Sequence, residues 1–207
     1  MDHLEIEVKF YITQINAIRD KIVDIGSVTC ERLFETNVIF EDKGKNLVKN
    51  RSLLRLRQDA KTLLTFKTKP DVKDDNFKIV RELEVEVSNF KTMARIFEFL
   101  GFHKEKIYEK WRETFVIKGS VLCIDTLPYG DFLEIEGEKE SIKELAEIVG
   151  LNWDERITTN YLELFEVVSN KYKLPFSNIT FANFKNIDID FKKCLSEVQL
   201  FKNNSLT

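Results

Sequence analysis

The stretch LEIEVKFY, residues 4–11, decides the fold of this chain, because it alternates apolar and charged side chains over its length. Its apolar residues share one parity, and its charged residues, Glu5, Glu7 and Lys9, share the other. Successive side chains of a β-strand point to opposite faces of the sheet. The stretch therefore predicts a strand with one apolar face and one ionised face.

The same alternation recurs along the chain and predicts further strands. Extended segments are expected at residues 28–41, 52–59, 62–69, 77–87, 107–118, 120–127 and 131–137. In most of them one parity is apolar and the other is polar or ionised. The polar parity holds Arg55, Arg57, Lys67, Lys69, Lys78, Glu82, Glu84, Glu86, Tyr108, Lys110, Arg112, Asp125, Glu134 and Glu136.

Helices are predicted between these strands, where apolar residues recur at three- and four-residue spacing. The first follows Thr13, a candidate N-cap, and ends near Gly26. Trp111 and Trp153 are expected to be core aromatic residues, since Trp111 lies on the apolar parity of its strand. Further helices are expected at residues 89–100, 141–149 and 159–168.

A chain of 207 residues is long enough for a domain with a substantial core, and no change in composition marks a second one. We predict one domain over residues 1–170, followed by a C-terminal extension, residues 171–207, that packs on it. This extension has no clear period, but it carries aromatic residues at Phe176, Phe181, Phe184 and Phe191.

The composition excludes several classes of protein. A hydrophobic fraction of 43% and a charged fraction of 32% are typical of a folded globular chain. The net charge of -3 argues against a general nucleic-acid binder, and no segment approaches the roughly 20 apolar residues of a spanning helix. The start lacks a signal-peptide pattern, and the three cysteines form no Cys-x-x-Cys motif. We therefore expect a cytoplasmic protein, monomeric or homodimeric, that binds neither nucleic acid nor membranes.

Two interpretations of the polar parity remain open. In the first, an open antiparallel sheet exposes its polar side to solvent. In the second, an α+β fold forms: the sheet closes into an antiparallel barrel of about eight strands, with charges inside and helices packed outside. Buried charges are costly unless they pair, hydrate or meet a ligand. Carboxylates in such an interior suit a divalent cation, and Arg and Lys suit phosphate oxygens.

Ordered motifs resemble the CYTH superfamily, the triphosphate tunnel metalloenzymes, which includes class IV adenylate cyclases and thiamine triphosphatases. The segment EIEVK, residues 5–9, is similar to the N-terminal Glu-x-Glu-x-Lys strand of this family. The resemblance spans about residues 4–166, and the spacing around residues 125–136 looks closest to the cyclase branch. It continues in order through RLR (55–57), LTFK (64–67), RELE (81–84), KWR (110–112), Asp125, GDFLEIE (130–136) and TNYLEL (159–164).

The resemblance implies a tunnel enzyme that binds a triphosphate-containing small molecule together with Mg²⁺ or Mn²⁺. The implied triphosphate-binding residues are Lys9, Arg55, Arg57, Lys67, Arg81, Lys110 and Arg112. The implied metal ligands are Glu5, Glu7, Glu134, Glu136 and Asp125, and the implied catalytic residues are Lys9, Glu84 and Asp125. Arg81 shares the parity of Leu83, so it faces inward only if a β-bulge intervenes.

Three activities are compatible with such a tunnel. We favour hydrolysis of inorganic triphosphate, thiamine triphosphate or a nucleoside triphosphate, because this reaction needs only a water in line with the terminal phosphorus. Cyclisation of ATP to cAMP and pyrophosphate, as in class IV adenylate cyclases, also needs adenine recognition, to which no sequence element is assigned. The similarity to the cyclase branch favours this alternative. A non-catalytic nucleotide- or polyphosphate-binding protein is the second alternative.

Overall fold

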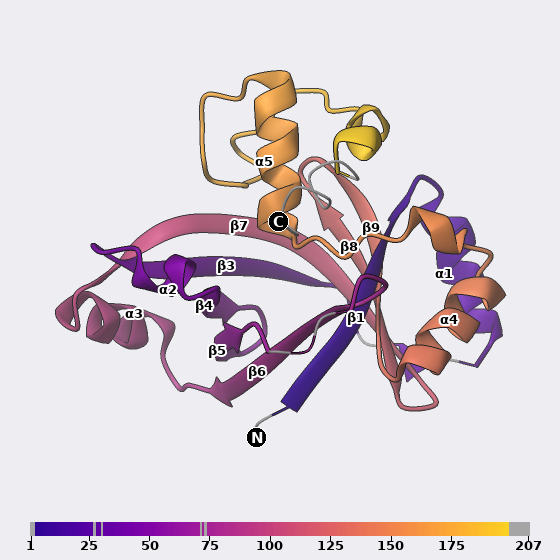
Figure 1. The fold of residues 1–207 in the computed structure, drawn as a ribbon, viewed down its shortest axis with the longest axis horizontal. Coiled ribbons are helices and arrows are strands. Elements are labelled where there is room, and N and C mark those ends of the chain that lie inside the picture. The colour runs from indigo at the N-terminus through magenta and orange to yellow at the C-terminus, as the bar shows by residue number, and fades with distance from the viewer. Residues whose placement is uncertain (1–2, 27, 30, 71, 73, 199–207) are drawn as a thin grey trace.

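One antiparallel sheet dominates the structure (Figure 1), a computed structural model that describes residues 3–26, 28–29, 31–70, 72 and 74–198. The strands are β1 (His3–Ile12), β2 (Val28–Thr29), β3 (Leu33–Asp42), β4 (Ser52–Gln58), β5 (Thr62–Thr68), β6 (Lys78–Glu86), β7 (Phe102–Ile117), β8 (Ser120–Leu127) and β9 (Gly130–Glu136). The helices are α1 (Ile15–Asp24), α2 (Asn46–Lys49), α3 (Phe90–Phe99), α4 (Lys139–Ile148) and α5 (Tyr161–Tyr172), with 3₁₀ turns η1 (Trp153–Glu155) and η2 (Phe191–Cys194).

The sheet closes on itself. Its order is β7-β3-β4-β5-β6-β1-β9-β8, and β8 pairs again with β7, so eight strands form a ring. Neighbouring strands in the ring are antiparallel, and β2 adds a short further strand to β7. The predicted α+β barrel of about eight strands with helices outside is confirmed, and the interpretation as an open sheet is wrong.

The apolar parity of the strands faces outward and is covered by helices on two sides of the barrel. Val8 and Phe10 of β1 belong to a core cluster that includes residues of α1 and α4, such as Ile22 and Ile142. On the other side, α3 covers β3 and β4, and the ring of Phe97 lies 4.9 Å from that of Phe40. The charged parity is left facing the interior.

A third apolar cluster fills the interior at one end of the barrel, beneath α5 (Figure 1). Leu127 and Phe132 belong to it, and they have the same inward parity as Asp125 and Glu134. They pack against α5 and against residues 173–198, which follow α5 along the chain. The interior therefore changes along its axis from charged to apolar.

Three local expectations were wrong. β7 begins at Phe102, five residues before the expected start of this strand. The cap of α1 is Gln14 rather than Thr13, and no side chain caps this helix. Trp111 lies on the outer face as expected but is 38% exposed, because it packs against Phe34 and Arg32 rather than under a helix.

Other expectations concern the second tryptophan, the cysteines and the membrane. Trp153 is partly buried against the cluster beneath α1 and α4. Cys123 and Cys194 are buried free thiols, whereas Cys30 lies outside the described residues. Among the helices that the structure describes, none combines the length and the apolar character needed to cross a membrane.

Candidate active site

The charged part of the barrel interior surrounds a cavity of about 1010 Å³. Strands β1, β4, β5, β6, β7 and β9 contribute to its wall, together with the start of α5. Its cationic lining residues are Lys9, Arg51, Arg55, Arg57, Lys67, Lys69, Lys78, Lys110 and Arg112. Its acidic lining residues are Glu5, Glu7, Asp74, Asp75, Glu82, Glu84, Glu134, Glu136, Glu163 and Glu166.

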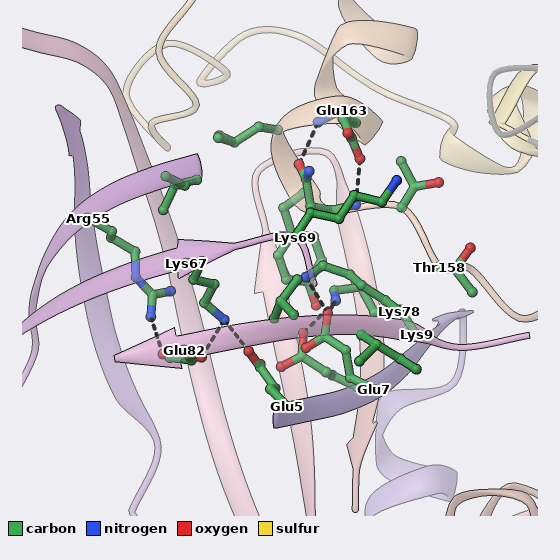
Figure 2. A pocket seen from close by; sticks show the side chains of 18 of the residues that line it. Glu5, Glu7, Lys9, Arg55, Lys67, Lys69, Lys78, Glu82, Thr158 and Glu163 are labelled. Carbon is green, nitrogen blue, oxygen red and sulfur yellow. Dashed lines mark hydrogen bonds and ion pairs between the residues drawn. The ribbon is translucent and has the colours of Figure 1, made fainter. Parts of the chain in front are cut away.

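Lys9 and Glu7 form the buried centre of the site, and each is no more than 2% exposed (Figure 2). Lys9 donates a hydrogen bond to the Glu7 carboxylate, and its Nζ lies 2.9 Å from Oε2 of Glu134. Lys78 donates to Glu7 over 2.7 Å. Burial opposes ionisation of Glu7, but Lys78 and Lys9 outweigh it and lower the pKa of Glu7 to about 2. Burial likewise opposes the charge on Lys9, but Glu134 and Glu7 raise its pKa, so both groups are charged at neutral pH.

A second group of charges lies between β4, β5 and β6 (Figure 2). Lys67 is bonded to Glu5, and its Nζ lies 2.8 Å from Oε2 of Glu82. Arg55 lies 3.8 Å from Glu82 and donates to the hydroxyl of Tyr108 over 3.2 Å. These contacts hold two cations at the cavity wall with their charges balanced by neighbouring carboxylates.

Asp125 is fully buried and lies behind the cavity wall rather than on it. Its carboxylate accepts hydrogen bonds from Lys110 Nζ at 3.0 Å, Arg112 Nε at 2.7 Å and the Tyr161 hydroxyl at 2.8 Å. Arg112 also lies 2.8 Å from Oε1 of Glu134. The Asp125 carboxylate is thus hydrogen-bonded to three residues, Lys110, Arg112 and Tyr161, which all line the cavity.

Glu35 is a buried carboxylate beside the cationic residues of the site, and the sequence analysis did not identify it. It is 3% exposed, and its carboxylate lies 3.6 Å from Lys110 Nζ, 3.9 Å from Arg112 Nε and 3.8 Å from an Arg57 nitrogen. Burial opposes its ionisation, but Lys110, Arg112 and Arg57 lower its pKa to about 2. The alternation of Glu35 with Asn37 on the inward parity was the signal that could have found it.

Tyr161, the first residue of α5, was also missed as a site residue. Its ring centroid lies 5.1 Å from Lys9 Nζ and 5.3 Å from Lys110 Nζ, within cation–π range. Burial, with Asp125 beside it, raises the pKa of Tyr161 well above its ordinary value, so its hydroxyl remains a donor. The TNYLEL motif placed this residue on a helix but assigned it no role.

The cavity brings together most of the predicted site residues. Arg81 is exposed and is not among the lining residues, because β6 pairs with β5 in continuous register and no bulge turns it inward. Glu84 lines the cavity and accepts from Thr65 Oγ1 over 2.8 Å. Of the residues predicted to bind triphosphate or metal, those that line the cavity are Lys9, Arg55, Arg57, Lys67, Lys110, Arg112, Glu5, Glu7, Glu134 and Glu136.

The carboxylates of β1 and β9 are the oxygen ligands that a divalent cation such as Mg²⁺ or Mn²⁺ would use. Glu7 is paired with Glu136 in the register of these strands. Burial, with Glu5, Glu134 and Glu7 nearby, raises the pKa of Glu136 to about 7, so negative charge is in excess there. Hard oxygen ligands suit these cations. Among the described residues, no group of three or more side chains is already arranged to bind a metal ion. Several of the carboxylates instead form ion pairs with lysines. The carboxylates are therefore ligands of the type that either cation needs. The excess negative charge around Glu136 supports this assignment, because a bound cation would neutralise it.

The closed barrel, with one cavity lined by paired cations and carboxylates, defines a class of antiparallel tunnel folds with a charged interior. The chain belongs to the CYTH domain family, whose domain matches residues 3–162. This finding confirms the resemblance seen in the sequence.

Individual relatives agree with this membership. A Methanocaldococcus jannaschii protein named "Putative adenylate cyclase" is 27% identical over 173 residues, which cover 78% of this chain and 98% of that protein. The X-ray structure of a Vibrio parahaemolyticus protein with the same description superposes with a TM-score of 0.70 at 17% identity, over 80% of this chain and 99% of that one. A Hippeastrum adenylyl cyclase candidate, described as having a dominant triphosphatase activity, has a TM-score of 0.53 at 22% identity, over 69% of this chain and 84% of that one.

Proposed function

We propose that the protein is a Mg²⁺- or Mn²⁺-dependent hydrolase that binds the triphosphate of a small molecule and cleaves its terminal phosphoanhydride bond. The observation that carries this proposal is the gathering of cationic side chains from five strands, β1, β4, β5, β6 and β7, around one cavity. Arg and Lys neutralise phosphoryl oxygens, and Arg does so through two parallel hydrogen bonds. The six proposed contacts are Lys9, Arg55, Arg57, Lys67, Lys110 and Arg112.

The site supplies positioning and an electrostatic field, which are the main requirements of phosphoryl transfer. Glu35 and Asp125 hold Lys110 and Arg112 in place before a substrate arrives, so little reorganisation is needed on binding. In the proposed reaction, water attacks the terminal phosphorus, the bond to the bridging oxygen breaks, and orthophosphate and a diphosphate are released. A bound divalent cation supplies Lewis-acid polarisation of the phosphoryl oxygens. Its proposed ligands are Glu5, Glu7, Glu134 and Glu136.

The relatives support an enzyme but divide between two reactions. The triphosphatase activity described for the Hippeastrum protein shows that this fold is compatible with hydrolysis. The name of the Methanocaldococcus jannaschii relative favours the second candidate, cyclisation of ATP to cAMP and pyrophosphate. In that reaction the ribose 3′-hydroxyl, rather than water, attacks the α-phosphorus. Both reactions would use the same six cationic residues, Lys9, Arg55, Arg57, Lys67, Lys110 and Arg112, which we call the cationic wall. The products must therefore distinguish the two reactions.

Product analysis is the test of this proposal. Purified protein is incubated with tripolyphosphate, thiamine triphosphate or ATP, with Mg²⁺ or Mn²⁺, and the products are separated by chromatography. We expect orthophosphate from at least one of the three substrates. cAMP and pyrophosphate as the main products from ATP would replace hydrolysis by cyclisation. Tight tripolyphosphate binding in calorimetry without turnover of any substrate would identify a non-catalytic binder.

Glu136→Gln tests the acidic side of the site. The amide cannot supply the negative charge that we assign to cation binding, so we expect kcat/KM to fall about 100-fold, with partial recovery at higher Mg²⁺ concentration. Glu86→Gln is the matched control, because Glu86 also lies on a strand but pairs with Lys61 at the exposed end of β6. Full activity of Glu136→Gln, or an equal loss in Glu86→Gln, would contradict this assignment.

A further inference from the structure

The residues that follow α5 pack against the back of the candidate site. We name residues 173–198 the C-terminal strap. The CYTH domain match ends at residue 162, so the strap lies beyond the part of the chain that the family accounts for. None of the strap residues lines the cavity, but the strap is attached to the barrel at two places: Ile179 pairs with Tyr108, which lines the cavity, and Phe191 packs on Tyr129 and Phe132, which do not.

The first attachment is to β7. β7 pairs with β8 only from Trp111 onward. The earlier residues of β7 therefore have no β8 partner on that edge. Ile179 of the strap fills this position: its N–H donates to the carbonyl of Ile107 and its carbonyl accepts from the N–H of Glu109, each over 2.8 Å. The residue between these two is Tyr108, whose hydroxyl accepts from Arg55 in the cavity.

The second attachment is Phe191, in the 3₁₀ turn η2. Its side chain is fully buried, and its ring lies 5.0 Å from that of Phe132 and 5.8 Å from that of Tyr129. Gly130 lies beside this contact: a Cβ at this position would lie 3.4 Å from Cβ of Phe191, an ordinary van der Waals distance, and 3.1 Å from the ring of Tyr11, which is tight. Phe191 therefore occupies a space formed between two residues of the β8–β9 turn region.

Phe132 and Tyr129 in turn fix Tyr161. The ring of Phe132 lies 5.4 Å from that of Tyr161, edge to face, and the hydroxyl of Tyr129 donates to the Tyr161 carbonyl over 2.9 Å. Tyr161 then donates to Asp125, which orients Lys110. A continuous series of packed rings and hydrogen bonds thus connects the strap with the cationic wall.

We propose that Phe191 is a positioning residue for the reaction and acts through Tyr161. Loss of the Phe191 ring leaves space into which Phe132 and Tyr129 relax, and Tyr161 moves with them away from Asp125. The strap therefore maintains the geometry of the cationic wall without touching the substrate. This inference rests on the proposed function for its kinetic test, because it names what holds that same site in order.

A double-mutant cycle in the full chain tests the inference, with kcat and KM for tripolyphosphate as readouts. We expect Phe191→Ala to lower kcat about tenfold, since displacements near 1 Å can cost up to about 100-fold in rate. We expect Tyr161→Phe, which removes the hydroxyl bonded to Asp125, to lower kcat similarly. Because the two residues act in series, the double variant should be no slower than Tyr161→Phe alone. Phe191→Leu, which keeps most of the apolar volume, should lose less than Phe191→Ala.

Phe176→Ala is the matched control within the strap. The ring of Phe176 packs on Phe165 and Phe184, at 6.3 Å and 5.2 Å, and these two rings in turn contact Tyr129, so Phe176 lies one contact further from Tyr161 than Phe191 does. We expect it to lower the melting temperature but to leave kcat unchanged. An equal fall in kcat for Phe176→Ala, unchanged kcat for Phe191→Ala, or additive losses in the cycle would overturn the inference. If Phe191→Ala does not fold, the cycle is measured with Phe191→Leu instead, and additive losses in kcat would again overturn the inference.

Failure of the proposed function is separable from failure of this inference. Release of no phosphate from any triphosphate by the unmodified chain would count against hydrolysis. In that case, calorimetry measures the dissociation constant of tripolyphosphate for the unmodified chain, the two single variants and the double variant. Non-additive weakening of binding by Phe191→Ala and Tyr161→Phe would support the connection through Tyr161, and additive weakening would overturn it.

Discussion

Glu35 illustrates how a single buried carboxylate stabilises a cationic wall. Its pKa falls from an ordinary 4.5 to about 2 on folding, so the unfolded chain binds more protons between these values. The resulting stabilisation is fully present above pH 4.5 and is lost as the pH falls through about 2. Its size is about 3 kcal/mol, since one pKa unit corresponds to about 1.4 kcal/mol.

Glu35→Gln should therefore lower the free energy of unfolding by up to about 3 kcal/mol at pH 7. The difference from the unmodified protein should shrink between pH 4.5 and pH 2, where Glu35 itself becomes neutral. Urea unfolding at several pH values measures both quantities. Glu86→Gln, at an exposed pair, should show no measurable change. A difference that does not vary with pH would show that Glu35 acts through packing and not through its charge.

Residue by residue, the alternation in the sequence predicted most of the charged side chains that line the cavity, although it missed Glu35. Glu5, Glu7 and Lys9 needed only the two-residue period of one strand. Tyr161 could not be found in this way, because it reaches the site from a helix whose placement depends on the packing of Phe132 and Tyr129. Side chains that meet through tertiary packing leave no periodic signal in the sequence.

At the level of elements, the start of α5 is stabilised by a capping box that also borders the cavity. The side chain of Asn160 accepts from the N–H of Glu163, and the Glu163 carboxylate accepts from the N–H of Asn160. Both residues line the cavity, and Tyr161 lies between them in the sequence. The orientation of the first turn of α5 is thus linked to the geometry of the site.

Asn160→Ala should lower the free energy of unfolding by about 1 kcal/mol and should also reduce kcat/KM. Asn89→Ala offers a matched comparison, since Asn89 caps α3 through the N–H of Thr92 and lies away from the cavity. It should cost similar stability without affecting kinetics. Chemical denaturation and steady-state assays of the two variants separate the contributions. Equal kinetic effects would mean that the cap of α5 has no specific connection with the site.

Prediction from sequence was weaker for the outer surfaces of strands than for their inner ones. The parity of Trp111 identified its side of the sheet, but exposure depends on whether a helix covers that position, and none of the described helices does. Leu83 and Val85 on β6 behave in the same way, with 47% and 55% of their surface exposed. Periodicity predicts the side of a sheet, whereas coverage follows from where α1, α3 and α4 are placed.

At the scale of the whole molecule, a polyanion that binds inside the barrel should stabilise the entire fold. Such a ligand binds the native state, because the cationic side chains around the cavity come from strands as far apart in the sequence as β1 and β7 and meet only in the closed barrel. At 100 times its dissociation constant, tripolyphosphate should contribute about 2.7 kcal/mol, which raises the melting temperature by several degrees. Lys67→Gln should reduce this rise, and Lys61→Gln, at an exposed pair outside the cavity, should not. Scanning calorimetry with and without tripolyphosphate measures the effect, and equal rises in both variants would argue against binding in the barrel.

Ring closure of the sheet also restricts how this lineage of proteins can change in length. Each of the eight strands is paired on both sides. Inserting or deleting one residue within a strand would therefore turn its charged side chains outward and its apolar side chains inward, out of step with both paired strands. Substitutions are tolerated more readily than such shifts of frame. Length variation is therefore expected to accumulate in the turns and beyond the barrel; in this chain the domain match ends at residue 162, at the start of α5, and the rest of α5 and the strap follow it.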